Sequence, residues 1–134
     1  MARTLTITIP GRPVPKPRMT KRDKWTRPPR ACVARYWAWA DAARLAAKEA
    51  GGLPPASSIS RITCTAFFDP PKSWPKKRQQ ACLGTPHRAA PDADNCLKAA
   101  GDSLFEDDRA IPDMAVSKRW GLPARMEITI EAEE

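Results

Sequence analysis

The sequence predicts a single small α/β (α+β) domain, in which a mixed sheet of about four strands packs against two or three helices. Short segments near the start, middle and end of the chain alternate apolar and polar residues, as half-buried strands do. Between them lie a long alanine-rich segment and two shorter segments with helix start and stop signals. A chain of 134 residues is long enough for one core, so we treat residues 1–134 as one domain.

The first four expected elements alternate between strand and helix. Residues 4–9 alternate threonine with leucine and isoleucine, which predicts a strand. Residues 31–50 contain neither glycine nor proline and predict the longest helix. Residues 58–68 alternate again and predict a second strand, and residues 73–84 predict a short helix with Ser73 as its cap.

The last three elements follow an acidic stretch. A helix is expected from about Ala93 to Leu104, with Asp92 just ahead of it. Residues 113–120 and 124–134 alternate between apolar and polar side chains, as strands do, and the turn GLP separates them. We therefore expect these two segments to pair as a hairpin.

Charge is concentrated in two segments of the chain, which has a net charge of +8 and a pI near 9.7. Residues 12–35 contain nine Lys/Arg and one acid, and residues 72–88 contain five Lys/Arg and no acid. Prolines make residues 12–30 an extended, stiff arm that suits a phosphate backbone. The expected DNA contacts are Lys16, Arg18, Lys21, Arg22, Lys24, Arg27, Lys72, Trp74, Lys76, Lys77 and Arg78.

Two tryptophans lie among these basic residues. Trp25 and Trp74 are candidates to stack on an unpaired base, an interaction worth ~1–3 kcal/mol per base. The alternative is that each ring covers an edge of the core. Cations at residues 76–78 open a short helix, where they oppose the helix dipole unless a phosphate is near.

Several other functions fit the sequence poorly. The four cysteines form no CxxC pair, so we expect reduced, packed thiols. Zinc at Cys82 and His87 would lack two further ligands, and nucleophilic chemistry would depend on this single histidine. We find neither a signal peptide nor the ~18 apolar residues of a membrane span, and therefore expect a cytoplasmic protein with no membrane partner.

The segment PDADNCLKAAGDSLFEDD, residues 91–108, contains six of the fifteen acidic residues of this basic chain. On the expected helix, ~3.6 residues per turn places Asp94, Lys98 and Asp102 in one stripe. Helix capping explains one acidic residue at the start, and an Asp94–Lys98 ion pair would be worth only ~0.3–0.5 kcal/mol. Neither role explains the second acidic cluster, residues 106–108.

Paired carboxylates also occur in calcium loops and in glycosidases. A calcium loop that starts at Asp92 would require an oxygen ligand, a glycine and a glutamate where the chain has Cys96, Leu97 and Ser103. A sugar site offers aromatic platforms rather than two basic segments. Oxygen ligands beside a basic surface instead indicate phosphodiester hydrolysis, in which Mg²⁺ or Mn²⁺ neutralises the phosphate and activates water.

Three segments resemble the RusA family of Holliday-junction resolvases, especially its phage and prophage members: IPGRPVPKPRMTKR, PPKSWPKKRQQACLGTPHRAAP and PDADNCLKAAGDSLFEDDRAI. The resemblance covers most of the chain, and DxDNxxKAxxD followed by a DD pair is its most specific motif. It implies a RusA-like homodimer that binds four-way DNA junctions and, with magnesium, nicks two strands of like polarity symmetrically.

The resemblance also implies site residues. Asp92, Asp94 and Asp108 would be the metal ligands, and Lys98 would be the essential lysine. The spacing between Asp102 and the DD pair is shorter than in many relatives, which leaves Asp107 and Asp108 as alternatives for the third ligand.

Symmetry gives an independent reason for a dimer, because a four-way junction has two-fold symmetry and each subunit has one carboxylate cluster. Two other functions stay open. One is a non-catalytic module that binds junctions or forks, and the other is a metal nuclease that acts on forks, flaps or RNA.

Overall fold

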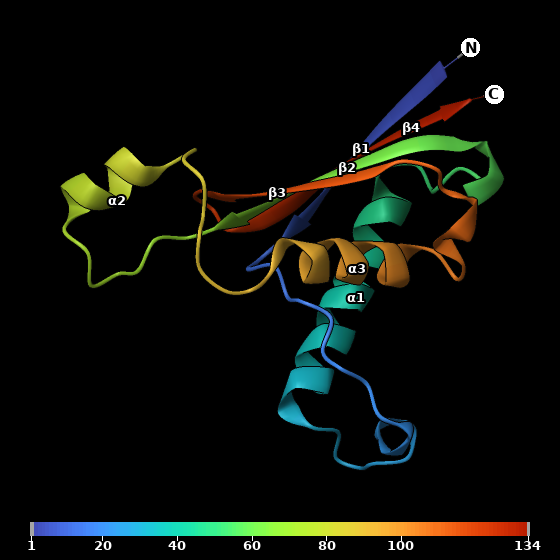
Figure 1. Cartoon of the computed structure of the whole chain (residues 1–134), viewed down its shortest axis with the longest axis horizontal. Helices are drawn as coiled ribbons and strands as arrows, with labels where there is room; N and C mark the ends of the chain where they lie inside the picture. Colours follow the sequence, from blue (N-terminus) through green and yellow to red (C-terminus); the bar gives the residue numbers. More distant parts are fainter. Residues whose placement is uncertain (1, 134) are drawn as a thin grey trace.

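The computed structural model describes residues 2–133, which form a four-stranded mixed sheet and three α-helices (Figure 1). The single-domain α+β class expected from the sequence is confirmed. The strands are β1 (Ala2–Pro10), β2 (Ile59–Phe68), β3 (Met114–Trp120) and β4 (Arg125–Glu133). The helices are α1 (Ala31–Glu49), α2 (Lys76–Cys82) and α3 (Ala93–Leu104), with the short 3₁₀ segments η1 (Lys21–Lys24), η2 (Ala56–Ser58) and η3 (Asp108–Ala110).

The sheet has the strand order β1-β4-β2-β3. β4 pairs antiparallel with both β1 and β2, and β3 pairs parallel with β2. One continuous row of apolar residues crosses all four strands, formed by Ile7, Ile128, Cys64 and Val116. The period-two patterns in the sequence place this row on the core side of the sheet.

Both long helices cover the same face of the sheet (Figure 1). α1 packs against β1 and α3 packs against β3, and the two helices contact each other. Small side chains on α1, among them Ala40, Ala43 and Ala47, are almost fully buried and permit a close approach. α1 ends where predicted, because Gly51 has a φ of 112° and Gly52 donates its backbone N–H to the carbonyl of Ala47.

The predicted hairpin of the last two strands is wrong. β3 and β4 are neighbours in sequence, but β2 lies between them in the sheet. The cause is burial: β4 contributes Met126, Ile128, Ile130 and Ala132 to the core, as a central strand must. None of the residues of β3 is fully buried, and this strand occupies an edge, where charged side chains are tolerated.

The start of the short helix α2 also differs from the prediction. Ser73 does not cap it, because the helix begins at Lys76 with Pro75 as the N-cap residue. The residue before a proline is disfavoured in the helical conformation, so Trp74 stays outside the helix. Among residues 2–133, no helix is both long and apolar enough to cross a membrane.

Candidate active site

The start of α3 places two carboxylates in solvent. α3 spans the predicted residues, and Asp92 is its N-cap residue. The side chains of Asp92, Asp94 and Lys98 are exposed, whereas Cys96 and Ala99 are fully buried on the opposite face of the helix. Burial of the apolar face therefore fixes the helix and directs the charged face outward.

Neither structural role that the sequence left open for these acids is present. Asp92 makes no capping hydrogen bond through its side chain. Within residues 2–133, the ion pairs do not include Asp94 with Lys98. Both carboxylates thus remain available to an external cation.

The loop that leads into α3 is held by a residue of β3. The Lys118 ammonium group donates to the carbonyl oxygens of Ala89 and Pro91, at 2.6 Å in each case. Its own backbone carbonyl accepts from the backbone N–H of His87 at 3.0 Å. Lys118 therefore fixes the backbone directly before Asp92. Sequence reasoning did not find this residue, because nothing in a strand 27 positions away marks it as an anchor.

The two residues of the DD pair have different environments. Asp107 caps η3 by accepting from the backbone N–H of Arg109, and it pairs with the Arg109 guanidinium at 2.7 Å. These hydrogen bonds from Arg109 lower the pKa of Asp107. Asp108 is half-buried and has no ion-pair partner within the described residues. The geometry thus favours Asp108 over Asp107 as the chemically available acid.

Asp108 lies against the middle of α3. A Cβ atom built on Gly101 would be 3.1 Å from Asp108 Oδ2, so the missing side chain of Gly101 leaves room for this carboxylate. Gly101 follows Asp94 by seven residues, which is about 10 Å along the helix axis and nearly the same direction around it. Asp108 therefore lies beside α3 at the level of the buried Gly101, about two turns beyond Asp94.

No group of three or more His, Cys, Asp or Glu side chains within residues 2–133 is close enough to hold a metal ion. Asp92, Asp94 and Asp108 are therefore not gathered into one three-carboxylate cluster in this structure. This arrangement differs from the shared three-carboxylate site that the resemblance implied.

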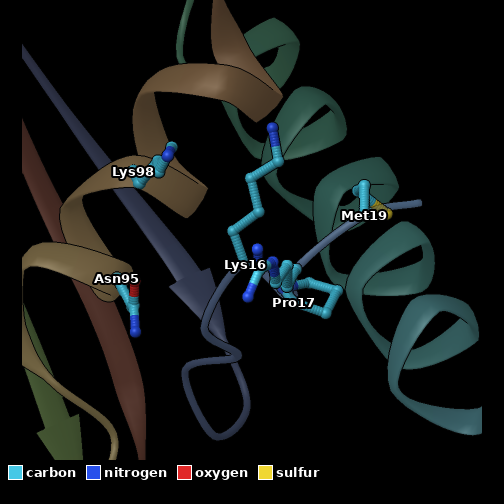
Figure 2. A pocket seen from close by; sticks show the side chains of 6 residues that line it. Lys16, Pro17, Met19, Asn95 and Lys98 are labelled. Atoms are coloured by element: carbon cyan, nitrogen blue, oxygen red, sulfur yellow. The ribbon is translucent and has the colours of Figure 1, made fainter. Parts of the chain in front are cut away.

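The start of the basic arm is attached to α3. The backbone N–H of Lys16 donates to the carbonyl of Asn95 at 3.3 Å, and its ammonium group pairs with Asp102 at 2.5 Å. Asp102, which the helix register placed in the same stripe as Asp94 and Lys98, therefore anchors the arm. Figure 2 shows Lys16 extending between α3 and α1, while Asn95 and Lys98 project from α3.

Together these side chains line a hollow of about 480 Å³ beside the start of α3. Its walls come from the arm and from α3, and three of its six lining residues are cations. The lining residues are Lys16, Pro17, Arg18, Met19, Asn95 and Lys98. The structure thus brings two of the expected DNA contacts, Lys16 and Arg18, next to the expected catalytic lysine.

The other expected DNA contacts form two separate groups. Lys21, Arg22 and Lys24 lie in η1, with Arg27 shortly after it, and all four are exposed. Lys72 precedes α2, and the exposed residues Lys76, Lys77 and Arg78 form its first turn. In Figure 1, α2 and the arm extend from the body in different directions, and α3 lies between them.

Trp74 is half-buried and has ring contacts of its own. The Arg78 guanidinium lies 3.6 Å from the centre of its ring, and the Trp120 ring lies at 5.2 Å. Trp25 differs, because 77% of its surface is exposed. Of the two tryptophans considered for base stacking, Trp25 therefore has the accessible ring.

His87 and two cysteines are placed as packing residues. The His87 ring stacks on Phe68 at 4.3 Å and contacts Trp120 at 4.4 Å, and burial lowers its pKa. Burial also raises the thiol pKa to about 12 for Cys64 and to about 11 for Cys96. Reactive thiolates at neutral pH are therefore not expected at either buried cysteine, which agrees with the sequence interpretation.

Exposed carboxylates at a helix start, a neighbouring lysine and flanking basic segments are groups that enzymes hydrolysing phosphodiesters with a metal ion use. Comparison with family models adds that the model of endodeoxyribonuclease RusA matches residues 10–131. This match spans nearly the whole chain, and the chain belongs to the RusA family. It is an endonuclease family that acts on Holliday junctions and is dependent on divalent metal ions. No curated protein matches the chain.

Proposed function

We propose that this protein is a magnesium-dependent endonuclease that resolves four-way DNA junctions by paired, symmetric nicks. The observation that carries the proposal is a pair of exposed carboxylates, Asp92 and Asp94, at the start of α3 and beside a basic hollow. Among residues 2–133, neither carboxylate has an ion-pair partner. The side chain of a purely structural acidic cap would accept a hydrogen bond from a backbone N–H of the first helical turn, and the side chain of Asp92 does not.

Asp92 and Asp94 fit a magnesium ion. Mg²⁺ commonly keeps several waters and is bound through one or two carboxylates together with substrate phosphates. A dedicated cage of three protein ligands is therefore not needed before DNA arrives. When bound, the ion would neutralise the scissile phosphate and lower the pKa of a coordinated water.

Asp108 is the third acid of the motif. Because it lies about two turns beyond Asp94, ligation of one ion by all three acids would require residues 105–110 to move when DNA binds. Asp108 could act as a metal ligand or as a charge that positions other groups, and a magnesium titration of the cleavage rate distinguishes these two roles. Loss of a ligand in Asp108→Asn raises the magnesium concentration needed for half-maximal rate, whereas loss of a positioning charge lowers only the rate at saturating magnesium.

Lys98 is proposed to stabilise the charge that develops on the phosphate. Its ammonium group is exposed, projects from the same helix as Asp94 and lines the basic hollow. A fixed cation beside developing negative charge is the kind of interaction that accelerates phosphoryl transfer. Lys98→Met would remove the cation, preserve most of the side-chain length and leave the hollow open.

The DNA backbone is proposed to bind over the hollow, η1 and the first turn of α2. These elements present exposed cations on both sides of α3. Such contacts position DNA without reading its sequence, so binding should weaken steeply with salt. A homodimer would present two equivalent sites to the two symmetry-related phosphates of a junction.

A panel of labelled duplex, fork, flap and four-way junction DNA, incubated with magnesium, tests this function. We expect symmetric nicks in the junction alone, and none with Asp92→Asn. The matched control is Asp41→Asn, which removes an exposed carboxylate from α1, far along the sequence from the site. Junction binding without nicks would support the non-catalytic module, and preferred cleavage of forks, flaps or added RNA substrates would support the other nuclease.

A further inference from the structure

The basic arm contains a single buried acid. Asp23 is the only acidic residue between positions 12 and 35, where nine residues are Lys or Arg, and only 5% of its surface is exposed. An acid among DNA contacts lowers affinity if it merely faces the phosphates. Its burial indicates a different role.

Asp23 accepts hydrogen bonds from two directions. The backbone N–H of Thr20 donates to its Oδ2 at 2.7 Å, which closes the first turn of η1. Arg30 donates Nε to Oδ1 at 2.9 Å and Nη2 to Oδ2 at 2.8 Å, in a two-point pairing. The hydrogen bonds from Arg30 hold the pKa of Asp23 well below its ordinary value.

Arg30 connects this turn to the body of the protein. It is the N-cap residue of α1, and its backbone carbonyl accepts from the backbone N–H of Ala34 at 2.9 Å. Its Nη2 atom also donates to the carbonyl of Arg18 at 2.9 Å. One guanidinium therefore joins the entry to the loop, the η1 turn and the start of α1.

The pairing of Asp23 with Arg30, here called the clamp, determines which groups of the arm face solvent. Because Asp23 points inward to Arg30, the intervening turn presents Lys21, Arg22 and Lys24 outward, together with the exposed ring of Trp25. A chain of this composition would otherwise be an extended, self-repelling coil. Fixing it in one conformation removes part of the ordering cost of binding.

We propose that Asp23 and Arg30 are positioning residues that preform residues 18–27 as a docking surface for DNA. Asp23, although negatively charged, increases affinity because it orders the surrounding cations. Arg30, although positively charged, acts through Asp23 and not on DNA. This inference deepens the proposed function by naming what organises the arm, and it rests on DNA being the substrate.

Asp23→Asn tests the clamp, because it removes one negative charge and preserves the side-chain shape. Simple electrostatics predicts tighter DNA binding for this variant. The clamp predicts about tenfold weaker binding to a four-way junction in a magnesium-free mobility-shift titration, from lost preorganisation. It also predicts faster trypsin cleavage after Lys21, Arg22 and Lys24.

The control variant Asp41→Asn breaks an exposed Asp–Arg pair on α1, with Arg44 at 3.0 Å, and removes the same charge. We expect it to bind junctions as the wild type does or slightly more tightly, with unchanged trypsin cleavage. Arg30→Gln breaks the clamp from the other side. If the clamp acts as one unit, the double variant Asp23→Asn/Arg30→Gln binds no more weakly than either single variant.

Equal or tighter junction binding by Asp23→Asn, with unchanged melting temperature and trypsin cleavage, would overturn the proposal. Additive losses in the double variant would overturn it as well. The mobility-shift titration contains no magnesium, so a result that overturns the clamp does not affect the result of the cleavage assay. Conversely, if the protein binds junctions through the clamp but does not cut them in magnesium, only the nuclease assignment is contradicted.

Discussion

Replacing Gly101 by alanine should separate stability from catalysis. Glycine inside a helix costs ~0.5–1 kcal/mol relative to alanine, so the substitution should stabilise α3. The new Cβ would lie 3.1 Å from Asp108 Oδ2 and 3.4 Å from the Cε atom of Met114. Since Asp108 is only half-buried, its carboxylate can shift by a few tenths of an ångström rather than destabilise the fold.

The expected result for Gly101→Ala is a melting temperature about 2–5 °C higher, which corresponds to that gain in a domain of this size. The rate of junction cleavage should fall about threefold to tenfold, because small misplacements of catalytic groups are costly. In an Asp108→Asn background, Gly101→Ala should change the cleavage rate no further. An unchanged rate in the wild-type background, or a further loss in the Asp108→Asn background, would refute the link between Gly101 and Asp108.

Two further predictions follow from buried groups. Burial lowers the pKa of His87, so the unfolded chain binds more protons than the folded one as pH falls below about 6.5, and stability is lost there. Melting curves at pH 7.5 and 5.5 should show this loss in the wild type and a smaller one in His87→Phe, and equal losses would contradict it. A thiol reagent at pH 7.5 should modify the half-buried Cys32 and Cys82 well before Cys64 and Cys96, whose pKa values are raised by burial to about 12 and about 11. Early labelling of Cys64 would show that the core opens.

Local patterns in the sequence were sufficient to predict most elements. The span of α3 was predicted because the apolar face, the preceding aspartate and the following break all agree on one register. The alternation over residues 58–68 likewise predicted β2, in which Ile62, Cys64, Ala66 and Phe68 are buried. These features depend on neighbours within a few residues.

The strand order was not predictable in the same way. A short turn between two alternating segments is the usual signal of a hairpin, yet β2 separates β3 from β4. β4 pairs with β1 on one edge and with β2 on the other, both far away in the sequence, so no edge of β4 is left for β3. Local turn chemistry contains no information on that competition.

The site was predicted in its residue types more fully than in its geometry. The helix register placed Asp94 and Lys98 in one stripe and Asp92 just ahead of the helix, and in the structure all three side chains are exposed. The supporting contacts, Lys118 on the loop before Asp92 and Lys16 on Asp102, join residues 27 and 86 positions apart. One available signal was missed: a lone acid within a basic segment, Asp23, indicated a specific partner.

Localised oxidation of the polypeptide by bound iron tests the central claim most directly. Fe²⁺ that replaces Mg²⁺ at the site, with ascorbate and peroxide, should cut the chain near residues 92–94 when junction DNA is present. We expect excess Mg²⁺ to suppress these cuts and Asp92→Asn or Asp94→Asn to abolish them, while Asp41→Asn leaves them intact. Cuts that map elsewhere, or that persist in both variants, would contradict a metal site formed by Asp92 and Asp94.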